Sequence, residues 1–232
     1  MVVIGRPLTG NFVKYKQPFD GRCLKEFLAS FHIYVLLALD RMSDKKLSPA
    51  HSHEDLWVFG YGSLMWRPGF EFLEQVPARL IGEHRALCVY SFDHRGTPEK
   101  PGLVLGLDRG GACRGIAFRV AATRRNEVVD YLRGREQTTH VYREVTCSVW
   151  LENEPRERIA ALAYVVDRGH VQYAGRLSLQ EQLRYVRQGH GRSGNNRDYV
   201  LETVRSIEAQ GLRDSQLHQL ALMLHNEAPQ HR

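Results

Sequence analysis

The stretch Trp57-Val58-Phe59-Gly60-Tyr61-Gly62-Ser63-Leu64-Met65-Trp66 is the strongest local signal in the chain. A short apolar run, typical of a strand, ends there in a Gly-x-Gly turn that carries a hydroxyl group. Glycines in such a turn let the backbone approach a ligand closely and point its N–H groups outward, which suits an anion. A plain tight turn with two permissive glycines would show the same pattern. The stretch is neither a Walker loop nor a dinucleotide fingerprint, because Met65 stands where the third glycine belongs.

Further strand-like runs follow at about residues 86–92, 103–107, 115–120, 144–151 and 159–166. They are rich in β-branched and aromatic residues and are bounded by glycine, proline or charged clusters. The pair Gly110-Gly111 is expected to join two of these runs as a hairpin turn.

Helical periodicity appears at 123–135, with Thr123 as the expected N-cap, and again at 178–188, 196–210 and 214–224. Ser178 and Glu181 stand at the spacing of a capping box. Strands come first, then one inserted helix, then a group of helices. This order predicts an α+β domain built on an antiparallel sheet or small barrel, and disfavours a repeated βαβ array.

Glu136 is the second residue that stands out, at the end of the helix predicted over 123–135. The partial negative charge of a helix C-terminus raises the pKa of a carboxyl group, whereas Arg133 and Arg135 would lower it. A carboxylate whose pKa can be adjusted in this way is what a general base requires. An ordinary exposed glutamate paired with an arginine would look the same. Ser63 has little support as a nucleophile, because the GxSxG elbow is absent.

A polar loop, residues 191–199, precedes one of the last helices. Ser193, Asn195 or Asn196 are expected to cap that helix. A small polar loop beside a binding site would have the same composition.

Composition excludes several classes of protein. The 232 residues hold 32 Lys+Arg against 26 Asp+Glu, a modest surplus of positive charge that forms no basic tail for nucleic acid. Hydrophobic residues make up 43% of the chain, which is enough for a buried core. The four cysteines are widely spaced and predict reduced thiols without a metal site. The pair His51/His53 lacks the further ligands that a metal site would need. No apolar stretch approaches the ~20 residues that span a bilayer, so a soluble, cytoplasmic protein is expected.

The basic residues suggest a domain boundary. Five of the six lysines precede residue 56, and 23 of the 24 basic residues from there on are arginines. We expect an N-terminal extension over 1–55, comprising an irregular segment, a helix at 23–41 and a polar linker. A catalytic domain over 56–225 and a tail over 226–232 complete the expected organisation. Met42 offers an alternative start.

Four features together resemble the ChaC-type γ-glutamylcyclotransferases, close to the bacterial members. They are the decapeptide 57–66, the pair Arg135-Glu136, Tyr142, and Ser-Gly-Asn-Asn-x-x-Tyr over 193–199. The resemblance covers about residues 56–220. It implies a γ-glutamylcyclotransferase-like fold, in which a small closed mixed or antiparallel β-sheet (a barrel) is surrounded by helices. It also implies that glutathione is cleaved into 5-oxoproline and cysteinylglycine without a cofactor or metal.

The resemblance also implies which residues form the site. Glu136 becomes the catalytic acid/base, and the substrate-binding residues are Gly60, Tyr61, Gly62, Ser63, Leu64, Met65 and Tyr142. The α-amine of the substrate attacks its own γ-carbonyl, so the protein needs no nucleophile. Glutathione carries a net charge of −1, which a mildly basic enzyme suits. We expect a monomer or weak dimer with no nucleic-acid or membrane partner.

One departure lies between Glu136 and Tyr142, where this chain reads Gln-Thr-Thr-His-Val and relatives tend to place glycine near the tyrosine. His140 and Val141 stiffen that loop, which bears on the role of Tyr142 and on the preferred γ-glutamyl compound. Two alternatives stay open. One is a cyclotransferase for other γ-glutamyl amino acids or amines, and the other is a non-catalytic regulatory binding protein.

Overall fold

The computed structural model describes residues 54–226. The helix predicted at 23–41, most of the predicted linker, Met42 and residues 227–232 of the predicted tail lie outside the described residues. Within the described part of the chain, no helix is long and apolar enough to span a membrane.

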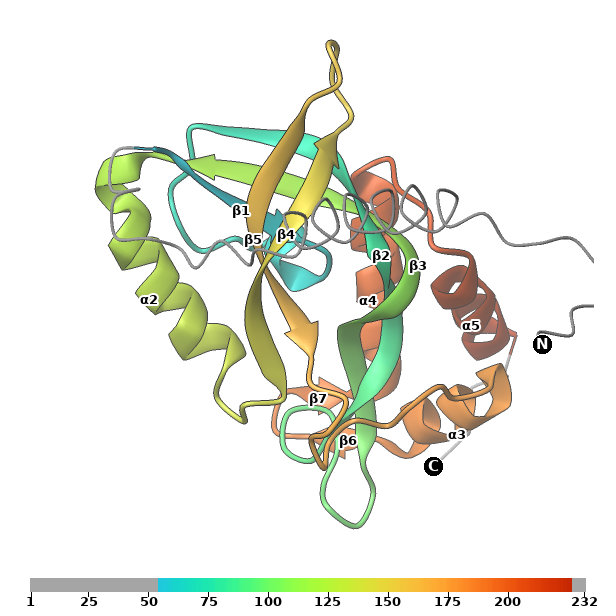
Figure 1. The fold of residues 1–232 in the computed structure, drawn as a ribbon. Coiled ribbons are helices and arrows are strands. Elements are labelled where there is room, and N and C mark those ends of the chain that lie inside the picture. The colour runs from blue at the N-terminus through green and yellow to red at the C-terminus, as the bar shows by residue number, and fades with distance from the viewer. Residues whose placement is uncertain (1–53, 227–232) are drawn as a thin grey trace, which may run out of the picture. The chain divides into compact units, whose positions relative to one another are not determined.

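Five strands close into a barrel in the order β1-β3-β2-β4-β5 (Figure 1). Their bounds are β1 Leu56–Gly60, β2 Glu74–Ser91, β3 Gly102–Val120, β4 Tyr142–Leu151 and β5 Arg158–Val166. Neighbouring strands run antiparallel, except that β1 and β5 run parallel, with Val58 opposite Leu162. This parallel pair closes the barrel, and the predicted closed mixed sheet of an α+β fold is confirmed.

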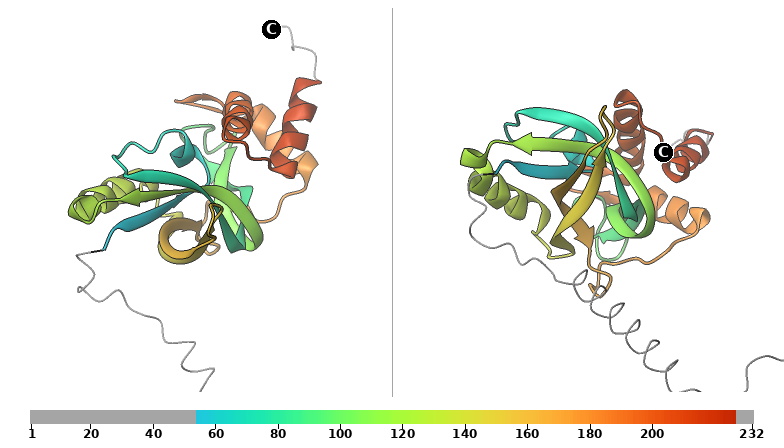
Figure 2. Two further views of the ribbon diagram at one scale, coloured as in Figure 1. Left: turned by 90° about the horizontal axis from the view of Figure 1, so that it is seen from above. Right: turned by 45° about the horizontal axis from the view of Figure 1, so that its top comes forward.

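The helices lie on two sides of the barrel. Helix α2 (Arg125–Glu136) connects β3 to β4, whereas α3 (Leu179–Gln188), α4 (Asn196–Ala209) and α5 (Ser215–His225) follow β5. Figures 1 and 2 show α2 alone on one side and α3, α4 and α5 grouped on the other. A short two-stranded ribbon, β6 (His190–Gly191) and β7 (Gly194–Asn195), leads into α4.

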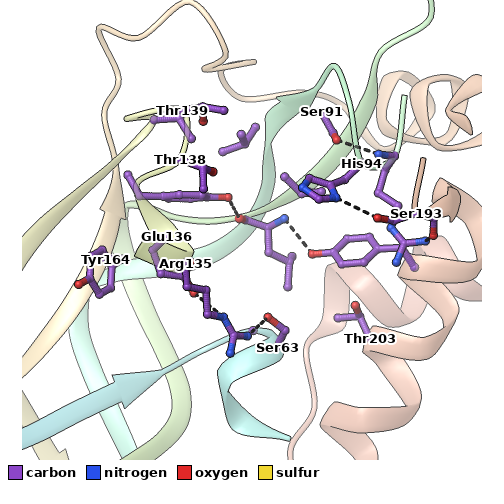
Figure 3. Close-up of a pocket in the computed structure, with 18 of the residues that line it drawn as sticks. Ser63, Ser91, His94, Arg135, Glu136, Thr138, Thr139, Tyr164, Ser193 and Thr203 are labelled. Carbon is purple, nitrogen blue, oxygen red and sulfur yellow. Dashed lines mark hydrogen bonds and ion pairs between the residues drawn. The ribbon is translucent and has the colours of Figure 1, made fainter. Parts of the chain in front are cut away.

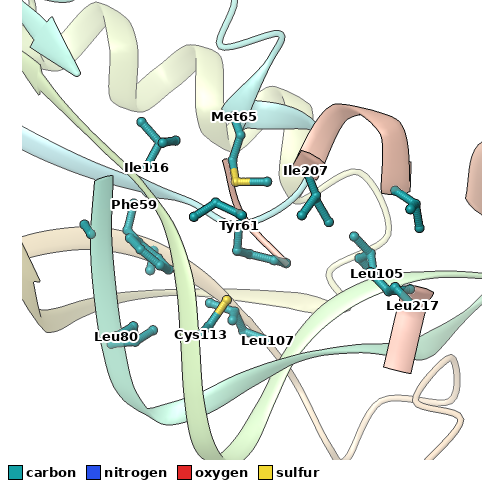
Figure 4. Packing of buried hydrophobic residues seen from close by; sticks show 14 of the residues in the cluster. Phe59, Tyr61, Met65, Leu80, Leu105, Leu107, Cys113, Ile116, Ile207 and Leu217 are labelled. Atoms are coloured by element: carbon teal, nitrogen blue, oxygen red, sulfur yellow. The ribbon is translucent and has the colours of Figure 1, made fainter. Parts of the chain in front are cut away.

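The hydrophobic core fills the barrel and continues to the side of α4 and α5. Phe59, Leu80 and Leu107 from three strands belong to the same buried cluster as Ile207 of α4 and Leu217 of α5 (Figure 4). The barrel and the C-terminal helices therefore share one core, which holds α4 and α5 against the strands.

The hairpin predicted at Gly110-Gly111 is wrong, and the runs 103–107 and 115–120 belong to one strand, β3. Both glycines have positive φ, 102° and 69°, and Gly82 on the facing strand has φ 101°. The register of β2 against β3 shifts at this place, between Ile81 and Glu83. Glycines here allow a β-bulge that bends the strand without reversing it.

The first half of β2, residues 74–85, was not predicted. Val76, Ala78 and Leu80 alternate there with exposed residues, which is the pattern of a strand with one buried face. Pro77 and the short apolar side chains weaken that signal.

The helix caps agree with the sequence in part. Ser178 and Glu181 form the predicted capping box of α3. The predicted Thr123 cap is wrong, because a 3₁₀ turn (Ala122–Arg124) precedes α2 and the N-cap position, Arg124, makes no side-chain cap bond. Among the described residues around α4, Asn195 occupies the N-cap position, also without a side-chain cap bond.

Gly115 of β3 provides a stability test, because β1 ends against it. A Cβ atom at Gly115 would lie 2.2 Å from the carbonyl oxygen of Gly60 and 2.9 Å from the ring of Phe59. We expect Gly115→Ala to lower the free energy of unfolding by about 1–3 kcal/mol, as overpacking does.

The matched control is Gly134→Ala in α2, where no atom lies within 4 Å of the added Cβ. It should raise the free energy of unfolding by roughly 0.5–1 kcal/mol, because alanine favours a helix over glycine. Urea unfolding measures both variants. Equal effects of the two substitutions would contradict the close approach of β1 to β3.

Candidate active site

The turn after β1 is shaped by close packing. A Cβ atom at Gly60 would lie 3.2 Å from Leu64 Cβ and 3.3 Å from the ring of Phe118. The chain then enters a 3₁₀ turn, Ser63–Met65, whose first bond runs from Met65 N–H to the Gly62 carbonyl oxygen, 2.9 Å. A helical turn leaves its first N–H groups without an acceptor of its own, so those of Ser63 and Leu64 are available to other acceptors.

A cavity of about 740 Å³ opens beside this turn. Its walls come from the turn, the end of α2, β4, the segment after β2 and the start of α4. Six predicted site residues line it: Tyr61, Gly62, Ser63, Leu64, Glu136 and Tyr142.

The other two predicted site residues, Gly60 and Met65, lie behind the cavity wall. Gly60 is the last residue of β1. Met65 is 2% exposed, and its Sδ atom lies 3.9 Å from Nη2 of the buried Arg85. Both residues hold the turn in place without lining the cavity.

Glu136 is the last residue of α2, and its side chain is only 18% exposed. Burial raises the pKa of its carboxyl group above the ordinary glutamate value, and the charge of Arg135, whose Nε lies 3.1 Å from Oε1, opposes that rise. Arg133, expected to act in the same way, instead forms an ion pair with Glu144 at 2.8 Å. The result is a carboxylate that binds a proton more readily than an exposed glutamate.

Three tyrosine hydroxyl groups lie within electrostatic reach of Glu136. Burial is the main cause that raises the pKa of Tyr61, Tyr142 and Tyr199, and the charge of Glu136 adds to it. The Tyr142 hydroxyl donates to the carbonyl oxygen of Leu105 at 2.6 Å, and the Leu105 N–H donates to the Tyr199 hydroxyl at 3.2 Å. The phenols therefore stay protonated at neutral pH.

Arg135 connects the end of α2 to the turn after β1. Besides its contact with Glu136, its Nη2 donates to Ser63 Oγ at 2.8 Å and its Nη1 donates to the Arg67 carbonyl oxygen at 2.6 Å (Figure 3). The guanidinium group has no acceptor function. The Ser63 hydroxyl therefore accepts from Arg135 and keeps its own proton for a ligand.

The loop from Glu136 to Tyr142 contains a residue in the left-handed region. His140 has φ 58°, a conformation that costs glycine little and other residues more. Val141 beside it is buried and lines the cavity. The left-handed residue and the buried valine lie directly before Tyr142.

The far wall of the cavity was not predicted as part of the site. It includes His94 and Arg95 after β2, and Ser193 before α4. The motif over 193–199 was the signal that could have located it. Asn196 uses its side chain to pair with the backbone of Leu103, with both bonds at 2.7 Å, instead of capping α4. Among the described residues, no three His, Cys, Asp or Glu side chains gather as a metal site.

The chain is similar to several known proteins. The family model described as ChaC-like protein matches residues 56–227. Glutathione-specific gamma-glutamylcyclotransferase of Escherichia coli is 31% identical over 165 residues, which is 71% of this chain and 71% of that protein. The protein of the same name from Schizosaccharomyces pombe is 32% identical over 180 residues, covering 70% of this chain and 86% of that protein.

A solved structure shares the fold. The crystal structure of a gamma-glutamyl cyclotransferase specific to glutathione from yeast superposes with a TM-score of 0.68, at 21% sequence identity. The match covers 77% of this chain and 99% of the yeast chain. At this level of identity the likeness establishes the barrel and its helices.

The raised pKa of Glu136 predicts a pH-dependent stability effect. Because its folded-state pKa lies above the unfolded value, ionised Glu136 costs stability, and the cost develops as pH rises from about 4.5 through the raised pKa. Glu136→Gln, which mimics the protonated form, should therefore melt above the wild type at pH 8. The difference should shrink toward zero in acid.

Glu144→Gln is the control of opposite sign, because hydrogen bonds from Arg133 lower the pKa of Glu144. Ionised Glu144 stabilises the fold, so this variant should melt below the wild type at pH 8 and approach it in acid. Thermal unfolding between pH 4 and 8 gives both trends. A Glu136→Gln variant less stable than the wild type at pH 8 would contradict the burial argument.

Proposed function

The chain belongs to the ChaC-like protein family, and we propose that it is a glutathione-specific γ-glutamylcyclotransferase. It cleaves glutathione into 5-oxoproline and cysteinylglycine. The observation that carries this proposal is the buried Glu136, whose pKa is raised and which shares one cavity with the hydroxyl and N–H groups of the turn after β1. We assign residues 56–225 to the catalytic domain.

Glu136 transfers the proton in this reaction. The α-amine of the γ-glutamyl group attacks the γ-carbonyl carbon, forming the C–N bond of the five-membered ring, and the amide bond to cysteine breaks. Glu136 takes the proton from the amine and returns it to the departing cysteine nitrogen. General acid–base catalysis of this kind contributes about 10²–10⁴-fold, and a raised pKa suits both halves of the transfer.

The turn after β1 stabilises the oxyanion that forms on the γ-carbonyl oxygen. Its N–H groups at Ser63 and Leu64 have no acceptor within the turn, and one donor of this type contributes about 10²–10³-fold. Arg135 fixes the Ser63 hydroxyl, which donates to the substrate. Gly60 and Met65 support the turn from behind.

The tyrosines orient the substrate. Tyr61 is buried, Tyr142 is half-buried, and both line the cavity with Glu136, so their rings limit the access of water to the reacting atoms. Ring closure requires the flexible γ-glutamyl arm to be bent, and holding it so is a large part of catalysis. No cofactor enters any step.

The enzyme acts in the cytoplasm as a monomer or weak dimer, without nucleic acid or membrane. Cys88, Cys113 and Cys147 are free thiols in the described part of the chain. Burial raises the pKa of each, to about 12, 11 and 11 in that order, which keeps them protonated. Reduced, unreactive cysteines fit a reducing compartment.

The direct test is mass-spectrometric detection of 5-oxoproline after incubation of purified protein with glutathione. We expect Glu136→Gln to lower kcat by at least about 10²-fold while leaving glutathione affinity largely unchanged, since only proton transfer is lost. Glu152→Gln is the matched control, because Glu152 is 23% exposed, pairs with Arg114 and lies outside the cavity wall. It should retain full activity.

Three results would redirect the proposal. Full activity of Glu136→Gln would remove its acid/base role. Faster release of 5-oxoproline from γ-Glu-Ala than from glutathione would favour a cyclotransferase for other γ-glutamyl compounds. A complete lack of 5-oxoproline from every γ-glutamyl substrate would favour the regulatory binding protein.

The pH dependence of kcat/KM tests the environment of Glu136. As a base it must be ionised, so kcat/KM should fall in acid with a midpoint above the ordinary glutamate value of 4.5. Arg135→Met should move that midpoint to higher pH, because the charge of Arg135 lowers the pKa of Glu136. A midpoint that stays in place or moves to lower pH would contradict the ion pair.

A further inference from the structure

Arg95 differs from the other arginines of the cavity wall in its partners. Its Nη1 donates to the backbone carbonyl oxygens of Ser193 and Asn195, at 2.6 and 3.3 Å. Within residues 54–226 no carboxylate forms an ion pair with it, so its charge is not neutralised by the protein. The remaining arginines of the wall each face a carboxylate, in the pairs Arg67–Glu202, Arg135–Glu136 and Arg192–Asp93, at 3.1, 3.1 and 2.8 Å.

The position of Arg95 is fixed by its surroundings. Its guanidinium carbon lies 5.3 Å from the centre of the Tyr199 ring, and its backbone N–H donates to Ser91 Oγ at 2.9 Å. Gly102 and Gly189 pack against its carbonyl oxygen, because a Cβ atom at either would lie 2.1 or 2.5 Å from that oxygen. A cation held in this way binds an anion without losing much side-chain freedom.

Arg95 and Glu136 lie on opposite sides of the cavity. Figure 3 shows Glu136 and Ser63 on one side and His94 and Ser193, the contacts of the Arg95 loop, on the other. The Tyr199 ring, which contacts the Arg95 guanidinium group at 5.3 Å, also lines the cavity. An anionic group bound at Arg95 therefore belongs to a part of the ligand that is remote from the reacting atoms.

Glutathione has such a group. Its γ-glutamyl carboxylate stays with the bent arm at Glu136, whereas two residues, cysteine and glycine, follow the scissile bond and span roughly 7 Å when extended. We propose that Arg95 binds the glycine carboxylate of glutathione and thereby makes the enzyme select the tripeptide over γ-glutamyl compounds without that carboxylate. This inference rests on the proposed function, because it names the second contact of the same substrate.

Ser193 supplies a second donor for this carboxylate. Nη2 of Arg192 lies 2.9 Å from Nε2 of His94, and a guanidinium group only donates, so Nε2 accepts. Nδ1 then carries the proton and donates to Ser193 Oγ at 2.9 Å, which leaves the serine hydroxyl proton free. The same tautomer prevents His94 from acting as a base toward Ser193. Asp93, His94 and Ser193 are the residue types of a catalytic triad, but in this tautomer His94 does not take the serine proton, so the three do not act as one.

The test compares glutathione with its glycine-side monoethyl ester, in which only the glycine carboxylate is blocked. Binding is measured by calorimetry in the Glu136→Gln background, where turnover does not interfere. Without an Arg95 substitution, the ester should bind about 10–100-fold more weakly than glutathione, as expected for a lost charged hydrogen bond. With Arg95→Gln added, glutathione should weaken by a similar factor and the ester should hardly change.

Arg67→Gln is the matched control, because it removes one positive charge from the same wall. It should weaken glutathione and the ester by the same factor, if at all. Arg95→Lys should recover part of the preference for glutathione. An Arg95→Gln variant that weakens both ligands equally, or neither, would overturn the assignment.

Two further measurements keep the outcomes distinct. If Arg95→Gln fails to fold, as judged by its melting curve, the ester comparison without an Arg95 substitution and the Arg95→Lys variant decide, and equal binding of glutathione and ester overturns the proposal. If the wild type releases no 5-oxoproline but glutathione still binds in an Arg95-dependent way, the proposed function fails and the carboxylate site stands.

Discussion

The guanidinium group of Arg135 is the interaction on which the site depends. It contacts Glu136 within α2, the Ser63 hydroxyl in the turn after β1 and the backbone carbonyl oxygen of Arg67. These segments are far apart in the sequence and meet because β1 pairs with both β3 and β5 to close the barrel. One fixed cation thus links the Glu136 carboxylate, the proposed acid/base, to the turn after β1, and it limits how far burial raises the pKa of Glu136.

Local sequence signals predicted the fold well where one segment decides the structure. The apolar run before Gly60 became β1, and Ser178 with Glu181 became the capping box of α3. The bend of β3 was not predictable in this way, because Gly110-Gly111 suits a hairpin and a bulge equally. The facing strand β2 decides between a hairpin and a bulge. Its register against β3 shifts at Gly82, opposite the glycine pair, and this shift depends on how the two strands pair.

The same distinction holds for the site. Glu136 could be singled out from its place at a helix end and from the family resemblance, and the structure places it in the cavity. The helix end alone did not show that Arg133 would turn away to Glu144, or that burial would dominate the pKa. Arg95 and Ser193 meet across 98 positions of sequence, and only the shared packing of the β2–β3 loop and the start of α4 brings them together.

A structure of the Glu136→Gln variant with glutathione bound is the most direct test of the proposed proton transfer by Glu136. We expect the α-amine nitrogen of the γ-glutamyl group to lie within hydrogen-bond distance of the side chain at position 136. The γ-carbonyl oxygen should face the N–H groups of the turn after β1. A γ-glutamyl group bound with its amine directed away from position 136 would contradict the proposed role of Glu136.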